Sequence, residues 1–202
     1  MDSVNPNEAT APGSKGTHVV CFDLETRRLA DEVGGWDQLK RGAGGVSCLV
    51  IWDNVSDHCN IYTAETLEAA AKHLESADVV LSFNGIEFDV PVLEGVLGRR
   101  LTIPVHLDLL RLIWNAISGR KKGNTLDETS KRTLGRGKTD KGTSAPRLAD
   151  LGKWSELFAY CAGDVLLTRD LFRFVQEHGG VIGSDDRLLY LHPPLHFTDW
   201  QF

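Results

Sequence analysis

A continuous apolar segment near the start of the chain, ending in two acidic residues, constrains the fold most strongly. The segment HVVCFDLE begins at His18 and carries apolar side chains at successive positions. Such a run is typical of a central strand buried on both faces, and strands of this kind lie in sheets that helices cover on each side. The sequence therefore predicts an α/β domain whose first strand ends in Asp23 and Glu25.

Four further segments have the composition of short strands. GVSCLVIWD and HCNIYT flank the polar turn 53–57, which predicts a hairpin, and ADVVLSFN and LTIPVHLD supply two more apolar runs. Helices are expected over 64–76 and between Thr125 and Gly135. A third helix is expected to begin at Asp89, because Pro91 is tolerated only in the first turn of a helix. A long amphipathic helix is expected over 153–178, and a mobile basic loop over 135–147.

Length and composition indicate one ordinary domain with extensions. The chain has 202 residues, enough to close a core without disulfides or structural metal. The longest apolar runs are too short to cross a bilayer, and residues 1–17 lack the apolar centre of a signal peptide, so we expect a disordered leader and a cytoplasmic protein with no membrane partner. The aromatic tail 184–202 is expected to pack on the domain, on a replication or repair protein, or on a second copy.

The charge is segregated along the chain. The formal net charge is -6, yet the segment 99–147 carries 12 Lys or Arg against 4 Asp or Glu. A basic segment of this kind is either a solvated loop or a surface that guides a polyanion, and charge alone favours neither interpretation.

Two pairs of residues have the spacing of a site. Asp23 and Glu25 lie at i and i+2 of a strand, so both side chains project to one face, where a divalent cation would relieve their repulsion. Tyr160 and Asp164 lie at i and i+4 of a helix, which places them on one side. Taken separately, the first pair is also compatible with a solvated strand end and the second with an ordinary amphipathic helix.

Three segments in order, FDLET, SFNGIEFD and YCAGD, resemble the motifs of the DEDD exonuclease superfamily. The tyrosine four residues before the last aspartate resembles the DEDDy branch of that superfamily. FDLETRRLADEVGGWDQL is also similar to the first motif of ribonuclease-H-like domains found in bacterial and phage genomes. The resemblance spans roughly residues 19–174. It implies a ribonuclease-H-like mixed five-stranded sheet flanked by helices, with the first three strands antiparallel and the next two parallel to the first, in an exonuclease domain over 18–183.

The same resemblance implies the roles of the site residues. Asp23 would bridge two metal ions, Glu25 and Asp164 would complete the shell of the first, and Asp89 would hold the second. Tyr160 would orient the attacking water. Oxygen ligands of this kind suit two Mg²⁺ ions, with Mn²⁺ able to substitute, and such a pair can activate water and neutralise a leaving oxygen.

Further residues are expected to contact the substrate or to be structural. The candidate substrate-binding residues are Thr26, Asn84, Phe88, Lys121, Lys122 and Lys138. Asn84 could instead serve a turn, and Phe88 could instead pack in the core. The three motifs leave no position for Asp108, which is interpreted as structural or helix-capping. The seven histidines show no close ligand spacing, so a histidine base is not expected, and the scattered cysteines indicate neither zinc nor disulfides.

These observations together predict a metal-dependent 3′→5′ exonuclease that acts on the 3′ end of single-stranded DNA. RNA is the second candidate substrate, because no residue in the pattern senses a 2′-hydroxyl. Two different functions are also compatible with the fold: a non-catalytic nucleic-acid-binding or docking module, and an endonuclease that uses the same metals.

Overall fold

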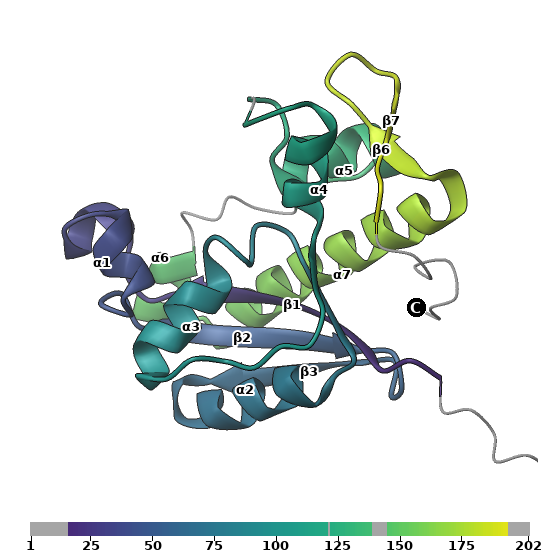
Figure 1. The fold of residues 1–202 in the computed structure, drawn as a ribbon. Helices are drawn as coiled ribbons and strands as arrows, with labels where there is room; N and C mark the ends of the chain where they lie inside the picture. Colours follow the sequence, from purple (N-terminus) through teal and green to yellow (C-terminus); the bar gives the residue numbers. More distant parts are fainter. Residues whose placement is uncertain (1–15, 121, 139–144, 194–202) are drawn as a thin grey trace, which may run out of the picture.

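A five-stranded mixed sheet forms the centre of the structure, a computed structural model that describes residues 16–120, 122–138 and 145–193 (Figure 1). The strand order is β3-β2-β1-β4-β5. β2 is antiparallel to both β1 and β3, whereas β4 is parallel to β1 and to β5. The predicted fold class and strand directions are therefore confirmed. The strands are β1 Val19–Thr26, β2 Val46–Asp53, β3 His58–Thr63, β4 Val79–Ser82 and β5 His106–Asp108.

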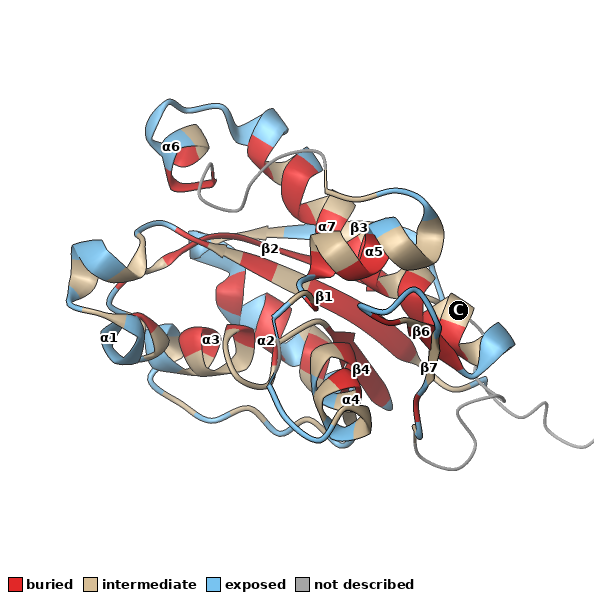
Figure 2. Cartoon of the chain, turned by 90° about the horizontal axis from the view of Figure 1, so that it is seen from above, coloured by how far each residue is buried: buried red, intermediate tan, exposed pale blue. Residues whose placement is uncertain are grey.

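Alternate side chains of β1 pack into two separate cores, one on each face of the sheet. Val19 and Cys21 face the long helix α7 (Trp154–His178), whereas Val20 and Phe22 face the other core. That second core includes side chains of α2 (Leu67–Ser76) and α3 (Asp89–Leu97). Figure 2 shows α5, α6 and α7 on one side of the sheet and α1, α2 and α3 on the other. Burial on both faces explains the unbroken apolar run that precedes Asp23.

The helix boundaries follow the sequence signals. α5 (Leu126–Leu134) begins at Thr125, whose hydroxyl accepts from the backbone N–H of Glu128, and it ends at Gly135 in the left-handed conformation with φ 69°. Pro91 occupies the third position of α3, as its missing N–H requires. The helix expected over 64–76 begins with a 3-10 turn, η2 (Ala64–Thr66), before α2.

Several elements were not predicted from the sequence. They are η1 (Ala30–Val33), α1 (Trp36–Lys40), α6 (Ala145–Asp150), β6 (Gly180–Ile182) and β7 (Leu188–Tyr190). The loop expected over 135–147 is wrong at its end, because α6 begins at Ala145, a buried residue that packs in the α7 core. Short helices such as these carry too few residues for a periodic pattern, and their burial comes from tertiary contacts.

The start of the aromatic tail lies within the fold. β7 pairs antiparallel with β6, and Leu191 is buried against the α7 core. The rest of the tail, with Phe197, Trp200 and Phe202, lies outside the described residues, as do 1–15 of the expected leader. The remaining helix, α4 (Leu109–Ala116), follows β5 directly. No helix among the described residues combines the length and apolarity that crossing a bilayer requires.

Candidate active site

The end of β1 brings two carboxylates to the α7 face of the sheet. Asp23 and Glu25 continue the alternation of Val19 and Cys21, so they point toward α7, and both are half-buried. The register with β2 shifts between Glu25 and Thr26. Such an irregularity ends regular pairing and is frequent beside active sites. Both acids therefore lie at the edge of the core between the sheet and α7.

Asp164 completes a close group of three carboxylates from the middle of α7. Single carboxylate oxygens of Asp23, Glu25 and Asp164 all lie within 4.8 Å of one another. The side chain of Asp164 is only 2% exposed. The thiol of Cys161, one turn earlier, donates to the backbone carbonyl of Asp23 at 3.4 Å, which ties the helix to the strand at this level.

Asp89 approaches the group from the opposite helix layer. It is the first residue of α3, is 4% exposed, and its Oδ1 accepts from the backbone N–H of Leu24 at 3.2 Å. This bond fixes the carboxylate between the two acids of β1. The structure therefore brings together all four acids that the sequence motifs indicated, Asp89 standing beside the group of three.

The four carboxylates oppose one another's ionisation. Burial raises the pKa of Asp23 well above its usual range, and the negative charges of Asp89, Asp164 and Glu25 raise it further. Burial and the charge of Asp164 likewise raise the pKa of Glu25. Burial raises the pKa of Asp89 to about 7, although its bond from Leu24 works in the other direction. Ionisation of all four acids would leave an excess of negative charge here, which a bound cation would stabilise.

Lys138 supplies one positive charge to the site. Its Nζ donates to Asp164 Oδ2 at 2.5 Å and to the hydroxyl of Tyr160 at 3.2 Å. Its backbone N–H donates to Asp127 of α5 at 2.9 Å, which anchors the segment after Gly135 over the site. Burial opposes the charged ammonium, but Asp164 and Asp23 outweigh it and raise the pKa of Lys138. One ammonium cannot balance four carboxylates.

Tyr160 lies one turn before Asp164 and presents its hydroxyl to the same space. The ring is buried in the α7 core, with 4% of the residue exposed. Burial and the neighbouring charge of Asp164 raise the pKa of Tyr160. The phenol therefore stays protonated at neutral pH and keeps its ability to donate a hydrogen bond.

These groups line a pocket of about 420 Å³. Thr26, Asn84 and Phe88, the three candidate substrate contacts from the motifs, line it. Phe88 also packs against the α2 and α3 core, which was the other interpretation of this residue. The Thr26 hydroxyl donates to the carbonyl of Arg28 at 2.9 Å, so its position is set by the strand end.

Asn84 owes its position to Asp108. Asn84 has a left-handed backbone with φ 72°, and its N–H donates to Asp108 Oδ1 at 2.9 Å. Asp108 Oδ2 accepts from the N–H of Ile86, and Oδ1 also accepts from Arg111 at the start of α4. The structural and helix-capping interpretation of Asp108 is thus confirmed.

The other described basic residues of the segment 99–147 do not line the pocket. Lys122 is exposed and does not line the pocket, and Lys121 lies outside the described residues. Arg132 donates to the carbonyls of Ile182 and Gly123, so it stabilises the fold. Arg136 forms an ion pair with Asp170 of α7. Of the predicted substrate-binding lysines, only Lys138 is placed in the pocket among the described residues.

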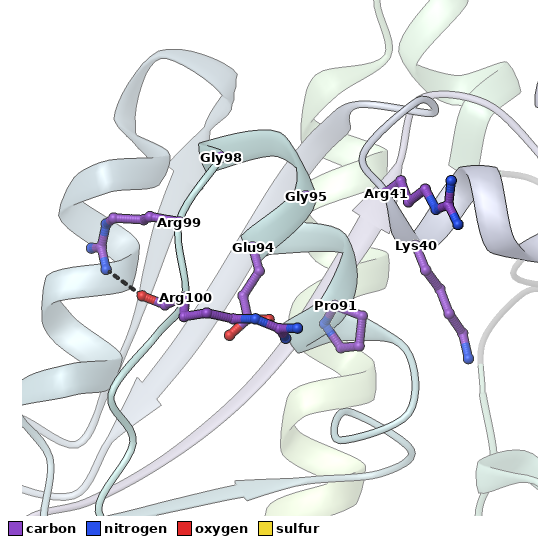
Figure 3. A pocket seen from close by; sticks show the side chains of 8 residues that line it. All are labelled: Lys40, Arg41, Pro91, Glu94, Gly95, Gly98, Arg99 and Arg100. Atoms are coloured by element: carbon purple, nitrogen blue, oxygen red, sulfur yellow. Dashed lines mark hydrogen bonds and ion pairs between the residues drawn. The ribbon is translucent and has the colours of Figure 1, made fainter.

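Sequence reasoning missed Trp36, an exposed aromatic residue at the mouth of the pocket. Its indole is 65% exposed and meets the ring of Phe88 edge-on, with 5.9 Å between ring centroids. α1 can lie this close to α3 because Gly42 and Gly95 meet: a Cβ on Gly42 would lie 2.5 Å from the Gly95 backbone. A neighbouring pocket of about 460 Å³ is lined by residues that include Lys40, Arg41 and Gly95. Figure 3 shows these residues around it. The local sign in the sequence was the pair Gly34 and Gly35, which directly precedes Trp36 and is typical of a turn.

The donor set fits divalent metal ions. Carboxylate oxygens are the ligands that Mg²⁺ and Mn²⁺ prefer, and the crowding of like charges in a half-buried pocket is relieved by such ions. The four acids line the pocket, and the described lining residues include no histidine or cysteine. The oxygens of Asp23, Glu25 and Asp164 lie close enough together to share one ion, and Asp89 lies near Asp23.

A family model described as the RNase_H superfamily matches residues 20–176. The chain belongs to the RNase H superfamily. The matched region holds all four acids and Tyr160. A search of the curated proteins finds no match. Among solved structures, the family B DNA polymerase from the hyperthermophilic archaeon Pyrobaculum calidifontis is similar, with a TM-score of 0.58 and 16% sequence identity. The likeness covers 80% of this chain but 25% of the polymerase, so it supports the RNase H superfamily fold.

Proposed function

We propose that this member of the RNase H superfamily is a 3′→5′ exonuclease of the DEDDy type, which uses two Mg²⁺ ions. The observation that carries the proposal is the meeting of Asp23, Glu25 and Asp164 within 4.8 Å, with Asp89 beside them, in one pocket. The three sequence segments that resemble the DEDD motifs supply these acids. Nothing in an ordinary structural role requires four unneutralised carboxylates to converge.

Asp23, Glu25 and Asp164 would hold one ion, and Asp23 with Asp89 the second. Two bound ions of this kind activate the attacking water and offset the charge that develops on the leaving oxygen. Tyr160, kept protonated and rigid within α7, would hold that water in line with the phosphorus. Lys138 Nζ, released from Asp164 when cations bind, would contact the scissile phosphate.

The mouth of the pocket suits a terminal nucleotide. Trp36 and Phe88 present aromatic surface on which a base can stack, a contact that tolerates any base. The Asn84 side chain forms no hydrogen bond with the described residues and lines the pocket, so it is available to the terminal sugar or phosphate. The fold likeness to a family B DNA polymerase supports single-stranded DNA as the preferred substrate.

The test is degradation of 5′-labelled DNA and RNA oligomers of one sequence by the full chain in Mg²⁺. The expected result is a ladder that shortens from the 3′ end, faster on DNA, and no product in EDTA. Circular single-stranded DNA should survive, because it has no end. Cleavage of the circle would identify an endonuclease, and preference for the RNA oligomer would identify an exoribonuclease.

The matched variants are Asp23→Asn, which removes a metal ligand, and Asp37→Asn, which changes an acid of α1 that does not line the pocket. Activity should be lost in the first and retained in the second. Binding of the oligomer without cleavage by the wild-type chain in Mg²⁺ and in Mn²⁺ would replace the proposal with a non-catalytic binding module.

A further inference from the structure

Two histidines and an aspartate meet at the end of the sheet opposite the carboxylate cluster. His18 precedes β1, Asp53 ends β2, and His73 lies on α2. Nε2 of His18 lies 3.1 Å from Asp53 Oδ2, and Nε2 of His73 lies 2.9 Å from the same oxygen. The side chains of His18, Asp53 and His73 are 24%, 13% and 15% exposed, respectively, so solvent reaches them.

We propose that His18, Asp53 and His73 form a second metal site, which takes a transition-metal ion of the Zn²⁺ class. Two imidazole nitrogens and one carboxylate oxygen are a donor set that favours zinc and related ions over Mg²⁺. The ligand atoms of all three residues lie within 4.8 Å of one another. Metal–ligand bonds of about 2.0–2.2 Å at tetrahedral angles require ligand atoms roughly 3.3–3.6 Å apart. The two distances from Asp53 Oδ2 to the histidine nitrogens, 3.1 Å and 2.9 Å, therefore need to lengthen only slightly.

The groups around the cluster hold the ligands in position. Asp53 Oδ1 accepts from the backbone N–H of Val55 at 2.7 Å and of Ser56 at 3.3 Å, which leaves Oδ2 directed at the imidazoles. The hydroxyl of Tyr62 lies 2.8 Å from His73 Nδ1. Metal-binding histidines usually have such a partner on the second ring nitrogen, and its presence sets the orientation of the ring.

The Tyr62 hydroxyl can form a hydrogen bond with His73 Nδ1 both with and without a bound metal ion. In the metal-free tautomer that carries its proton on Nε2, the His73 ring donates to the Asp53 carboxylate and accepts from the Tyr62 hydroxyl at Nδ1. With metal on Nε2, the ring proton moves to Nδ1 and is donated to the Tyr62 oxygen. Metal binding therefore leaves no polar atom of the His73 ring without a partner.

The charge of the cluster also favours a cation. No described lysine or arginine forms an ion pair with Asp53, whose charged contacts are the two histidines. Hydrogen bonds from His73 and from the Val55 N–H lower the pKa of Asp53 against the effect of its partial burial, so it is ionised at neutral pH. Asp78 adds a second carboxylate nearby, bound to the backbone N–H of His18 at 2.8 Å.

The bound ion would be structural. It would join the entry to β1, the end of β2 and α2, three segments from distant parts of the chain. Binding to the folded state alone raises stability by mass action, and Zn²⁺ at a hundred times its dissociation constant should raise the melting temperature by about 5 °C. The site lies on the α2 face at the start of β1, whereas Asp23, Glu25 and Asp164 lie on the α7 face at the end of β1, so the two clusters are chemically and spatially separate.

The test is titration of the full chain with Zn²⁺ in saturating Mg²⁺, which keeps the carboxylate site occupied. We expect one Zn²⁺ per chain and a loss of affinity of at least about a hundredfold in His18→Gln and in His73→Gln. Asp23→Asn should retain the affinity, and so should His178→Gln, whose ring instead stacks on Phe174. Equal Zn²⁺ affinity in wild type, His18→Gln and His73→Gln would overturn the proposal.

A second measurement does not depend on the folding of the variants. Crystals of the wild-type chain soaked in Zn²⁺ should show an anomalous peak bonded to Nε2 of His18, Nε2 of His73 and Oδ2 of Asp53. Anomalous maps without a peak at that position, at Zn²⁺ concentrations that saturate the calorimetric titration, would show that the three residues form only a hydrogen-bonded bridge.

Discussion

Two clusters of ionisable residues lie at opposite ends of β1 and on opposite faces of the same sheet. At one end Asp23, Glu25 and Asp164 crowd together; burial raises the pKa of each, and repulsion from the neighbouring carboxylates adds to the rise for Asp23 and Glu25. At the other end Asp53 is surrounded by donors, which lower its pKa. The first cluster is unsatisfied without a cation, whereas the second is already hydrogen-bonded. The contrast teaches that convergence of ligands alone does not define a catalytic centre; uncompensated charge beside a pocket does.

The strongest way to break this comparison is to remove one carboxylate from the crowded cluster. Glu25→Gln should lower kcat by about a thousandfold or more, because a lost ligand removes several kcal/mol of metal-dependent stabilisation. In EDTA the same variant should melt no lower than wild type, since it removes a like charge. A variant that loses stability as well as activity would mean that the acids are structural. Single-turnover cleavage and thermal melting provide the two readouts.

Tyr160→Phe separates chemistry from folding within the same cluster. The ring remains packed on α7, so the melting temperature should stay within a degree or two, while turnover falls by roughly a hundredfold through loss of the hydroxyl that holds the water. KM should change little, because the hydroxyl acts on the water and not on the substrate. An unchanged kcat would remove Tyr160 from the mechanism.

Removing the central acid of the other cluster should have the opposite profile. Asp53→Ala leaves His18, His73 and two backbone N–H groups without their acceptor, which should cost about 2 kcal/mol of unfolding free energy. Nuclease activity at a temperature where the variant is folded should equal that of wild type. Urea unfolding checks the first statement, and a loss of activity in the folded variant would contradict the separation of the two clusters.

The pH dependence of stability gives a smaller effect of defined sign. The pKa of Asp89 is raised to about 7, so without metal the fold favours its protonated form. Its contribution to stability is therefore fully present below about pH 4, the unfolded pKa of an aspartate, and is lost as the pH rises to about 7. Asp89→Asn should reduce this fall in unfolding free energy when both proteins are measured in EDTA. Identical pH profiles would show that Asp89 does not titrate in this window.

Much of the fold and most of the acidic site could be predicted because their signals are local. The buried run of β1 and the capping residues Thr125 and Gly135 act within a few positions. The three acid-bearing motifs are recognisable from their order along the chain, so the sequence is enough to select Asp23, Glu25, Asp89 and Asp164 as candidate ligands.

What escaped prediction depends on contacts between distant segments. α1 and Trp36 are placed by the close approach of Gly42 and Gly95, and α6 by burial against α7. The histidines show no ligand spacing in sequence, yet His18 and His73 meet at Asp53 because their elements are adjacent in the sheet and its α2 layer.

The basic segment shows the same dependence on tertiary contacts. The ion pair of Arg136 with Asp170 and the bonds from Arg132 to backbone carbonyls give these two basic side chains structural roles. Sequence reports the charge of these side chains but not the acceptors that the fold brings to them.

The most direct test of the central claim is the number of Mn²⁺ ions that the acidic cluster binds. The full chain is titrated with Mn²⁺ in the presence of a deoxynucleoside 5′-monophosphate, the expected product, and free Mn²⁺ is followed by electron paramagnetic resonance. Two ions should bind to the wild-type chain, and both should be lost in Asp23→Asn, because Asp23 is the shared ligand. Absence of Mn²⁺ binding by the wild-type chain, or the same stoichiometry in Asp23→Asn, would contradict the account.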